Sequence, residues 1–159
     1  MIRIRGASTA DGPRLVELHA GVQDVHLRHR PDWFVAQPGG EEVRADFEAA
    51  FGDPHVSVLV AELSSGPAVV GYALARVVKR DSSTEAQARS TVMLEQLGVD
   101  PDASRAGVGS ALLEAVREIG REAGCQSLVT NVWSFNTPAR GFYEASGLVP
   151  RTQQLEQNL

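Results

Sequence analysis

Apolar residues recur along this chain with two different periods, and the period changes from segment to segment. Residues 1–5 alternate between apolar and polar as in a short strand, whereas 15–25 carry apolar residues at helical spacing. Residues 56–63 and 68–80 are strand-like and are joined by SSGP, which predicts a hairpin. The same patterns predict three more helices: one over 43–51, one from the glycine pair near 108 to Gly124, and a short one ending at Gly147. They also predict strands over 91–99, over 127–133 and from Val149 onward.

This order of elements, β–α–α–β–β–β–α–β–α–β, predicts one mixed sheet with helices on both faces. Strands that follow one another early in the chain indicate antiparallel pairing, whereas the helix between 99 and 127 indicates a parallel crossover. We therefore expect an α/β (α+β type) fold with a mixed, mostly antiparallel central sheet of roughly six to seven strands. A length of 159 residues fits a single domain over 1–159.

Composition excludes some classes of function. The net charge of −5 argues against broad nucleic-acid binding, which requires a basic surface. No run of about eighteen apolar residues occurs, so no membrane partner is expected. The one cysteine, Cys125, suits a cytoplasmic protein and has no histidine near it in sequence, which disfavours a cysteine nucleophile.

The most informative stretch is LEQLGVDPDASRAGVGSALL, residues 94–113, in which a strand is followed by a polar connection and a glycine pair that opens a helix. Bare N–H groups and the helix dipole favour an anion at such a start, so Gly107 and Gly109 indicate a phosphate-bearing ligand. The nucleotide-hydrolase loop GxxxxGK[ST] is absent, and the dinucleotide pattern GxGxxG fails at Leu112. A glycine pair alone is also typical of a flexible turn into a helix.

A second motif, NTPARGFYEASGLVPR at 136–151, favours one ligand. Together the two stretches resemble the Gcn5-related N-acetyltransferase (GNAT) family: the first resembles its acetyl-CoA motif, and the second its downstream motif with an Asn, an Ala, an aromatic–Tyr pair and a Gly. The resemblance covers nearly the whole chain. It implies the GNAT-like acyl-CoA N-acyltransferase fold, with acetyl-CoA as co-substrate.

The resemblance also implies roles for individual residues. The main chain of Leu97, Gly98 and Val99 would pair with the pantetheine arm, and Asn136 and Tyr143 would lie near the thiol. The coenzyme A pyrophosphate would be bound by the backbone around Ser104, Arg105, Ala106, Gly107, Val108, Gly109 and Ser110.

One position departs from the family pattern. Three residues before Gly107, where the family usually has Arg or Gln, this chain has Ser104. Backbone donors do not depend on that side chain, and Arg105 adds a neighbouring positive charge, so we expect coenzyme binding to survive.

Acetyl transfer to an amine needs a proton acceptor, a donor to the developing oxyanion and an acid for the leaving thiolate. Tyr143 is the candidate acid, because a phenol carries a proton at neutral pH; a core aromatic is the alternative interpretation. The backbone N–H of Val99 is the candidate oxyanion donor, and Gly98 before it is consistent with a bulge.

The candidate base is Glu95, which alternates with apolar Met93 and Leu97 along its strand. LEQLGV resembles the strand of family members, including polyamine acetyltransferases, in which a Glu relays the amine proton through water. An ordinary strand-surface Glu explains the pattern equally well, and His26 and Glu62 are weaker alternatives.

We therefore expect an enzyme that transfers acetyl from acetyl-CoA to a primary amine by direct attack on the thioester. The acceptor would be a small-molecule or protein amine, bound near the first two helices and the loop with Asp32, Trp33 and Phe34. A non-catalytic acetyl-CoA sensor is the alternative function. No metal is expected, because the histidines of the first helix (His19, His26 and His29) have no carboxylate or cysteine at ligand spacing. The resemblance also makes a homodimer a reasonable expectation.

Overall fold

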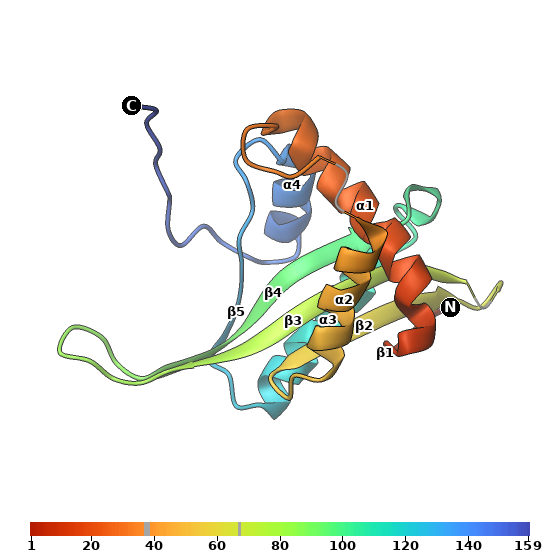
Figure 1. Cartoon of the computed structure of the whole chain (residues 1–159). Coiled ribbons are helices and arrows are strands. Elements are labelled where there is room, and N and C mark those ends of the chain that lie inside the picture. The colour runs from red at the N-terminus through yellow and green to blue at the C-terminus, as the bar shows by residue number, and fades with distance from the viewer. Residues whose placement is uncertain (37–38, 67) are drawn as a thin grey trace.

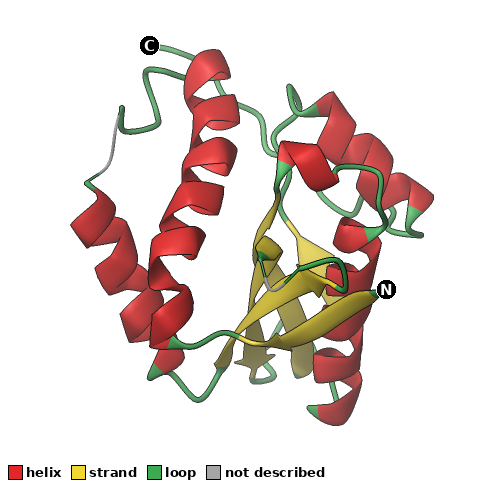
Figure 2. Cartoon of the chain, turned by 90° about the vertical axis from the view of Figure 1, so that its right-hand side faces the viewer, coloured by secondary structure: helices red, strands yellow, loops and turns green. Residues whose placement is uncertain are grey.

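The computed structural model describes residues 1–36, 39–66 and 68–159. Figure 1 shows a twisted sheet with helices on both sides, and Figure 2 shows the same layers from a second direction. The elements are β1 (Ile2–Gly6), α1 (Gly12–His29), α2 (Gly40–Phe51), β2 (Val56–Leu63), β3 (Val69–Arg80), β4 (Arg89–Val99), α3 (Val108–Glu122), β5 (Ser127–Thr130) and α4 (Thr137–Ala145), with 3-10 turns at Thr9–Asp11 and Pro101–Ala103.

The sheet has the strand order β1-β2-β3-β4-β5. The first three pairs are antiparallel, which confirms the predicted hairpin, and β4 pairs with β5 in parallel across α3, which confirms the crossover. Five strands are present in the described structure, fewer than the six to seven expected.

The difference lies at the C-terminal end of the chain. The segment from Val149 onward, predicted to start a last strand, runs as an exposed tail away from the sheet (Figure 1), with Val149 81% and Leu155 84% exposed. Local alternation is not sufficient for a strand, because each strand also needs an edge to pair with.

Each face of the sheet has its own core. On one face α3 buries Leu112 and Val116 against Val92 and Leu94 of β4. On the other face α1 and α2 cover Tyr72 of β3, and the members of this second cluster include Leu15 and Phe47. The amphipathic stripes of the helices therefore decide which side of the sheet each one covers.

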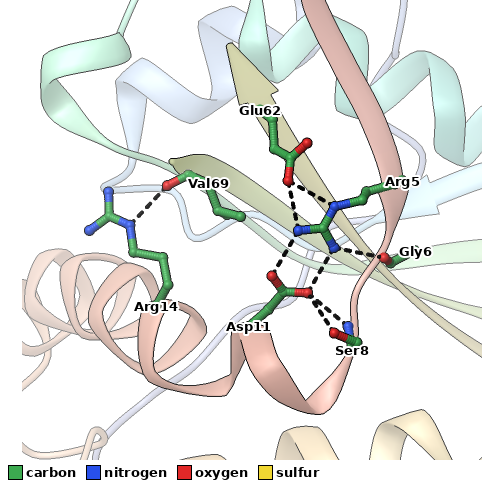
Figure 3. Close-up of polar contacts among 7 residues, drawn as sticks. All are labelled: Arg5, Gly6, Ser8, Asp11, Arg14, Glu62 and Val69. Atoms are coloured by element: carbon green, nitrogen blue, oxygen red, sulfur yellow. Dashed lines mark hydrogen bonds and ion pairs between the residues drawn. The ribbon is translucent and has the colours of Figure 1, made fainter. Parts of the chain in front are cut away.

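A network of ion pairs joins the start of α1 to the first two strands (Figure 3). The Arg5 guanidinium donates to Asp11 Oδ2 at 2.8 Å and to Glu62 Oε1 at 2.8 Å. Asp11 Oδ2 also accepts from the backbone N–H of Ser8 at 2.8 Å. The hydrogen bond from Arg5 is the main cause that lowers the pKa of Asp11 to about 2.

Candidate active site

The two strands β4 and β5 pair over only part of the length of β4. Their register runs from Thr91 opposite Ser127 to Leu94 opposite Thr130, and β4 then continues to Val99. Within the described residues, no strand pairs with this edge of β4 beyond Leu94. The edge formed by 95–99 is therefore open to a ligand that pairs with main-chain groups, as a strand would. We call this opening the fork.

A bulge marks the point where the fork begins. Between β3 and β4 the register shifts at Leu74–Ala75, so that Glu95 is the extra residue of β4. The sequence placed the bulge at Gly98, and this was wrong by three residues. Nothing in the sequence around Glu95 distinguishes a bulge from regular strand.

Gly98 is needed for a different reason, which is close packing against a core aromatic. A Cβ at this position would lie 2.5 Å from Cε1 of Tyr72 and 3.0 Å from Cγ2 of Val22. The Tyr72 hydroxyl donates to Gln96 Oε1 at 2.9 Å, which holds the ring in this place. The glycine thus lets α1 and β3 approach the end of β4.

A cavity of about 360 Å³ lies where α1 faces the end of β4. The end of β4 contributes Leu97, Gly98 and Val99, and the start of α4 contributes Asn136. From α1 the lining includes Val22, Val25 and His26. The structure thus brings together one group of predicted site residues, and it adds a wall from α1 that the glycine motif does not reveal.

The structure separates the predicted pair Asn136 and Tyr143: Asn136 precedes α4 and lines the cavity, whereas Tyr143 lies on α4 near the start of the fork. Asn136 caps this helix, since its Oδ1 accepts from the backbone N–H of Ala139 at 3.3 Å. Burial raises the pKa of the Tyr143 phenol, and a hydrogen bond with the Thr130 side chain opposes this effect in part. Thr130 in turn donates to the Leu94 carbonyl at 2.9 Å, so Tyr143 contacts the last residue pair of β4 and β5.

The loop before α3 presents backbone N–H groups at a helix start. Gly107 is the N-cap residue of α3, with φ 85° and without a side-chain capping bond. Arg105 also has a positive φ, of 65°, which is uncommon for a residue other than glycine. When residues with left-handed and right-handed backbone conformations alternate, their successive N–H groups point toward one spot. The concave backbone that results can bind an anion. Gly109 has a separate role, because a Cβ there would lie 3.3 Å from the Phe142 ring.

A salt bridge between α1 and the end of β4 fixes the connection to this loop. Asp100 Oδ1 accepts from the backbone N–H of Asp102 at 2.9 Å, and Oδ2 binds the Arg14 guanidinium. Both contacts lower the pKa of Asp100, and the hydrogen bond from the Asp102 N–H has the larger effect. Arg14 Nε also donates to the Val69 carbonyl at 2.8 Å (Figure 3). Sequence reasoning missed this pair, because its members are far apart in the chain.

The candidate base Glu95 does not face the cavity. Its Oε1 accepts from Arg76 Nε at 2.8 Å, and Arg76 also binds Asp53 at 3.0 Å. Among the residues that the structure describes, neither Glu95 nor Tyr143 belongs to the cavity lining. Glu62, a weaker alternative, is bound to Arg5 in the ion-pair network of Figure 3.

An aromatic cluster lies beside the cavity, where the end of α1, the loop after it and the loop after β5 meet. His26 joins the cluster to the cavity, with ring centroids 5.0 Å from Phe34 and 5.9 Å from Phe135. Trp133 lies 5.7 Å from Trp33 and 5.5 Å from Phe34. The full cluster consists of His26, His29, Trp33, Phe34, Trp133 and Phe135.

Within the described residues, no three His, Cys, Asp or Glu side chains gather in a way that could hold a metal ion. No helix in the same part of the chain has the length and apolar character needed to cross a membrane.

The comparison with known families decides between the classes of phosphate-binding protein. The model of the acetyltransferase (GNAT) family matches residues 22–148, which include the fork, the first motif and most of the second. The chain belongs to the acetyltransferase (GNAT) family. The acetyl-CoA-dependent N-acetyltransferase class predicted from the sequence is therefore confirmed, with acetyl-CoA as the co-substrate of this class.

Similar proteins agree with the family. The thialysine N-epsilon-acetyltransferase of Bos taurus is 32% identical over 120 residues, a match that covers 71% of this chain and 66% of the bovine protein. A tetramutant of the BH1408 protein from Bacillus halodurans has a similar structure, with a TM-score of 0.91 at 26% identity, over 99% of each chain. The aminoglycoside N-acetyltransferase AAC(6')-Iy, solved in complex with CoA, has the same fold, with a TM-score of 0.78 at 19% identity. The match covers 100% of this GNAT chain and 95% of the AAC(6')-Iy chain.

Proposed function

We propose that this protein transfers the acetyl group of acetyl-CoA to a primary amine, by direct attack of the amine on the thioester. The fork is the observation that supports this most. An open edge over 95–99 gives the pantetheine arm main-chain partners, and it leads toward the loop with positive φ at Arg105 and Gly107. In this arrangement the pyrophosphate binds the N–H groups at the start of α3.

The chemistry at the fork follows from the groups that surround it. The N–H of Val99 stabilises the oxyanion as the tetrahedral intermediate forms. The buried phenol of Tyr143 stays protonated at neutral pH, because burial raises its pKa, and it donates this proton to the departing thiolate. Glu95 acts as base only if a water or a change in its ion pair with Arg76 connects it to the cavity.

We propose a small cationic amine as the acceptor. The aromatic cluster next to the cavity offers ring faces, which attract cations. It already holds one, since the Arg30 guanidinium lies 5.6 Å from the Trp33 ring centroid and 5.2 Å from that of Trp133. The bovine relative, named for thialysine, makes amino-acid side-chain amines the first acceptors to try.

The test is a panel of primary amines incubated with acetyl-CoA, with release of the free coenzyme A thiol as the signal. The panel contains thialysine, lysine, polyamines, aminoglycosides and a peptide with a free N-terminus. We expect turnover with at least one small cationic amine, together with saturable acetyl-CoA binding by calorimetry. Binding of acetyl-CoA without turnover of any amine would instead favour the non-catalytic sensor. Absence of acetyl-CoA binding would refute both functions.

A further inference from the structure

We propose that the imidazole of His26 is the proton acceptor of the reaction, with Nε2 as the accepting atom. This inference rests on the proposed function and names a catalytic residue for it. It replaces the base expected from the sequence, Glu95, with a residue of α1.

The position of His26 is the first argument. Its side chain lines the cavity together with Leu97, Gly98 and Val99, the segment that is assigned to the pantetheine arm and that contains the proposed oxyanion donor, the Val99 N–H. Asn136 completes the same lining from the start of α4. An amine that reaches a thioester beside Val99 within this cavity therefore shares the cavity with the His26 ring. A general base must be within hydrogen-bond reach of the proton that it removes.

The tautomer of His26 is the second argument. Nδ1 lies 2.7 Å from the carbonyl oxygen of Val22, one turn earlier in α1. A carbonyl oxygen can only accept, so Nδ1 must carry the hydrogen of this bond. In a neutral imidazole the lone pair is then on Nε2. Phe34 and Phe135 pack against the ring at 5.0 Å and 5.9 Å between centroids, and they limit its rotation.

The competing carboxylates are the third argument, because each one that is near the cavity is bound to an arginine. Glu17 accepts from Arg14 at 2.8 Å, and Asp100 binds the same guanidinium. Glu95 is bound by Arg76 at 2.8 Å and lies outside the lining of the described cavity. In each case the guanidinium occupies a carboxylate oxygen that would otherwise be free to accept the proton of the amine.

The lone pair of the neutral amine attacks the thioester carbon, and a new N–C bond forms. The nitrogen, now positively charged, gives one proton to Nε2 of His26. The C–S bond then breaks, and the sulfur takes a proton from the Tyr143 phenol. The imidazolium returns its proton to the phenolate through water, so that one amide and one free thiol are the only products.

Other charged groups surround His26 and must be kept constant in the test. His29 ends α1, Arg30 follows it as the C-cap residue, and Asp32 lies on the next loop. Glu156 of the C-terminal tail binds Arg30 at 3.0 Å. At the far end of the cavity are the ion-paired groups, Arg14, Glu17 and Asp100.

The test compares His26→Gln with His55→Gln, using the amine that the panel identifies. His55 controls for the loss of an imidazole, because it is exposed and lies between α2 and β2. It is not among the lining residues of the described cavity, and it is not a member of the aromatic cluster. We expect His26→Gln to lower kcat by about 100-fold and to leave the Kd of acetyl-CoA within about 2-fold of wild type. We expect His55→Gln to keep kcat within about 2-fold.

Two readouts separate a proton acceptor from a residue that only supports the wall of the cavity. In His26→Gln the acid limb of the kcat/KM profile should disappear or move, and added imidazole should restore part of the rate. His26→Phe keeps a ring between Phe34 and Phe135, so it tests the chemistry even if the Gln variant folds poorly.

Near-wild-type kcat in His26→Phe would overturn the proposal. So would an unchanged pH profile in His26→Gln, with a large loss in Glu95→Gln instead. Failure of the proposed function itself is seen separately and earlier, as wild-type protein that acetylates nothing in the panel.

Discussion

A methyl group on Gly98 would lie 2.5 Å from Cε1 of Tyr72, a distance that side-chain carbons do not tolerate. Tyr72 is fully buried in the core beneath α1 and α2, whereas Gly98 lines the cavity. The core and the site therefore share this contact. It explains why β4 has a glycine at the position where a ligand is expected.

We predict that Gly98→Ala lowers the free energy of unfolding by about 1–3 kcal/mol, because the Tyr72 ring must shift to make room. It should also weaken acetyl-CoA binding, since the same shift moves the main chain of 97–99. Urea denaturation and calorimetry measure the two effects. Gly6→Ala is the matched control, because no atom lies within 4 Å of a Cβ at Gly6. An equal loss of stability in both variants would contradict the packing argument.

The glycine at the start of α3 gives a second prediction. Gly107 has φ 85°, so Gly107→Ala should strain the backbone or rotate it and disturb the N–H groups proposed to bind the pyrophosphate. We expect the Kd of acetyl-CoA to rise at least about 10-fold, which corresponds to about 1.4 kcal/mol. Isothermal calorimetry measures this change directly.

Gly124→Ala is the control for backbone strain at the other end of the same helix. Gly124 has φ 72°, and no atom lies within 4 Å of a Cβ built there. Gly124→Ala should therefore lower the free energy of unfolding by about as much as Gly107→Ala does. It should leave acetyl-CoA affinity unchanged. If Gly124→Ala weakened binding as much as Gly107→Ala, the anion site at the start of α3 would be refuted.

These positions also show how far the sequence could predict the structure. Hydrophobic periodicity predicted the hairpin and the crossover, because both depend on short-range patterns. Gly124 was correctly predicted to end α3, and its φ of 72° with the Cys125 N–H bonded to the Gly120 carbonyl at 2.8 Å confirms the reason. The glycine pair was likewise visible, because bare N–H groups at a helix start have a short sequence signature.

The remaining features depend on contacts between distant segments. The bulge at Glu95 arises from pairing with β3, and the left-handed Arg105 has no signature because arginine rarely adopts this conformation. The cavity wall of Val22 and His26 exists only because α1 crosses the end of β4. The strand predicted from Val149 failed for the same reason, since its pattern contains no information about a pairing edge.

A third prediction concerns Tyr143 as the acid. Tyr143→Phe removes the phenol hydroxyl but keeps the ring against Phe142, 5.2 Å away between centroids. We expect kcat to fall by about 100-fold with little change in the Kd of acetyl-CoA. Steady-state kinetics and calorimetry on the same preparation give both values.

Tyr72→Phe is the matched control for the loss of a buried phenol. Its hydroxyl bonds to Gln96 at 2.9 Å, so its removal should cost stability of about 1 kcal/mol and leave kcat nearly unchanged. Wild-type kcat in Tyr143→Phe would remove the phenol from the mechanism and leave thiolate departure unassisted.

The ion-pair network at the start of α1 gives a prediction about pH. The pKa of Asp11 falls from its ordinary value of 3.8 to about 2 in the folded protein, mainly through Arg5. A lowered pKa means that the folded state favours the charged carboxylate more than the unfolded state does. The carboxylate therefore stabilises the fold by about 2 kcal/mol above pH 4, and this contribution is lost as the pH falls toward 2.

We predict that Asp11→Asn removes this pH-dependent part of the stability. Wild type should lose stability more steeply than the variant between pH 4 and 2, the interval between the unfolded and folded pKa values of Asp11. Asp24→Asn is the control, because the Asp24 side chain is 63% exposed and pairs with Arg28 on the helix surface, at 3.2 Å. That substitution should change stability by less than about 0.5 kcal/mol. Urea unfolding at a series of pH values distinguishes the two, and parallel curves for wild type and Asp11→Asn would show that Arg5 does not hold the carboxylate in its charged form.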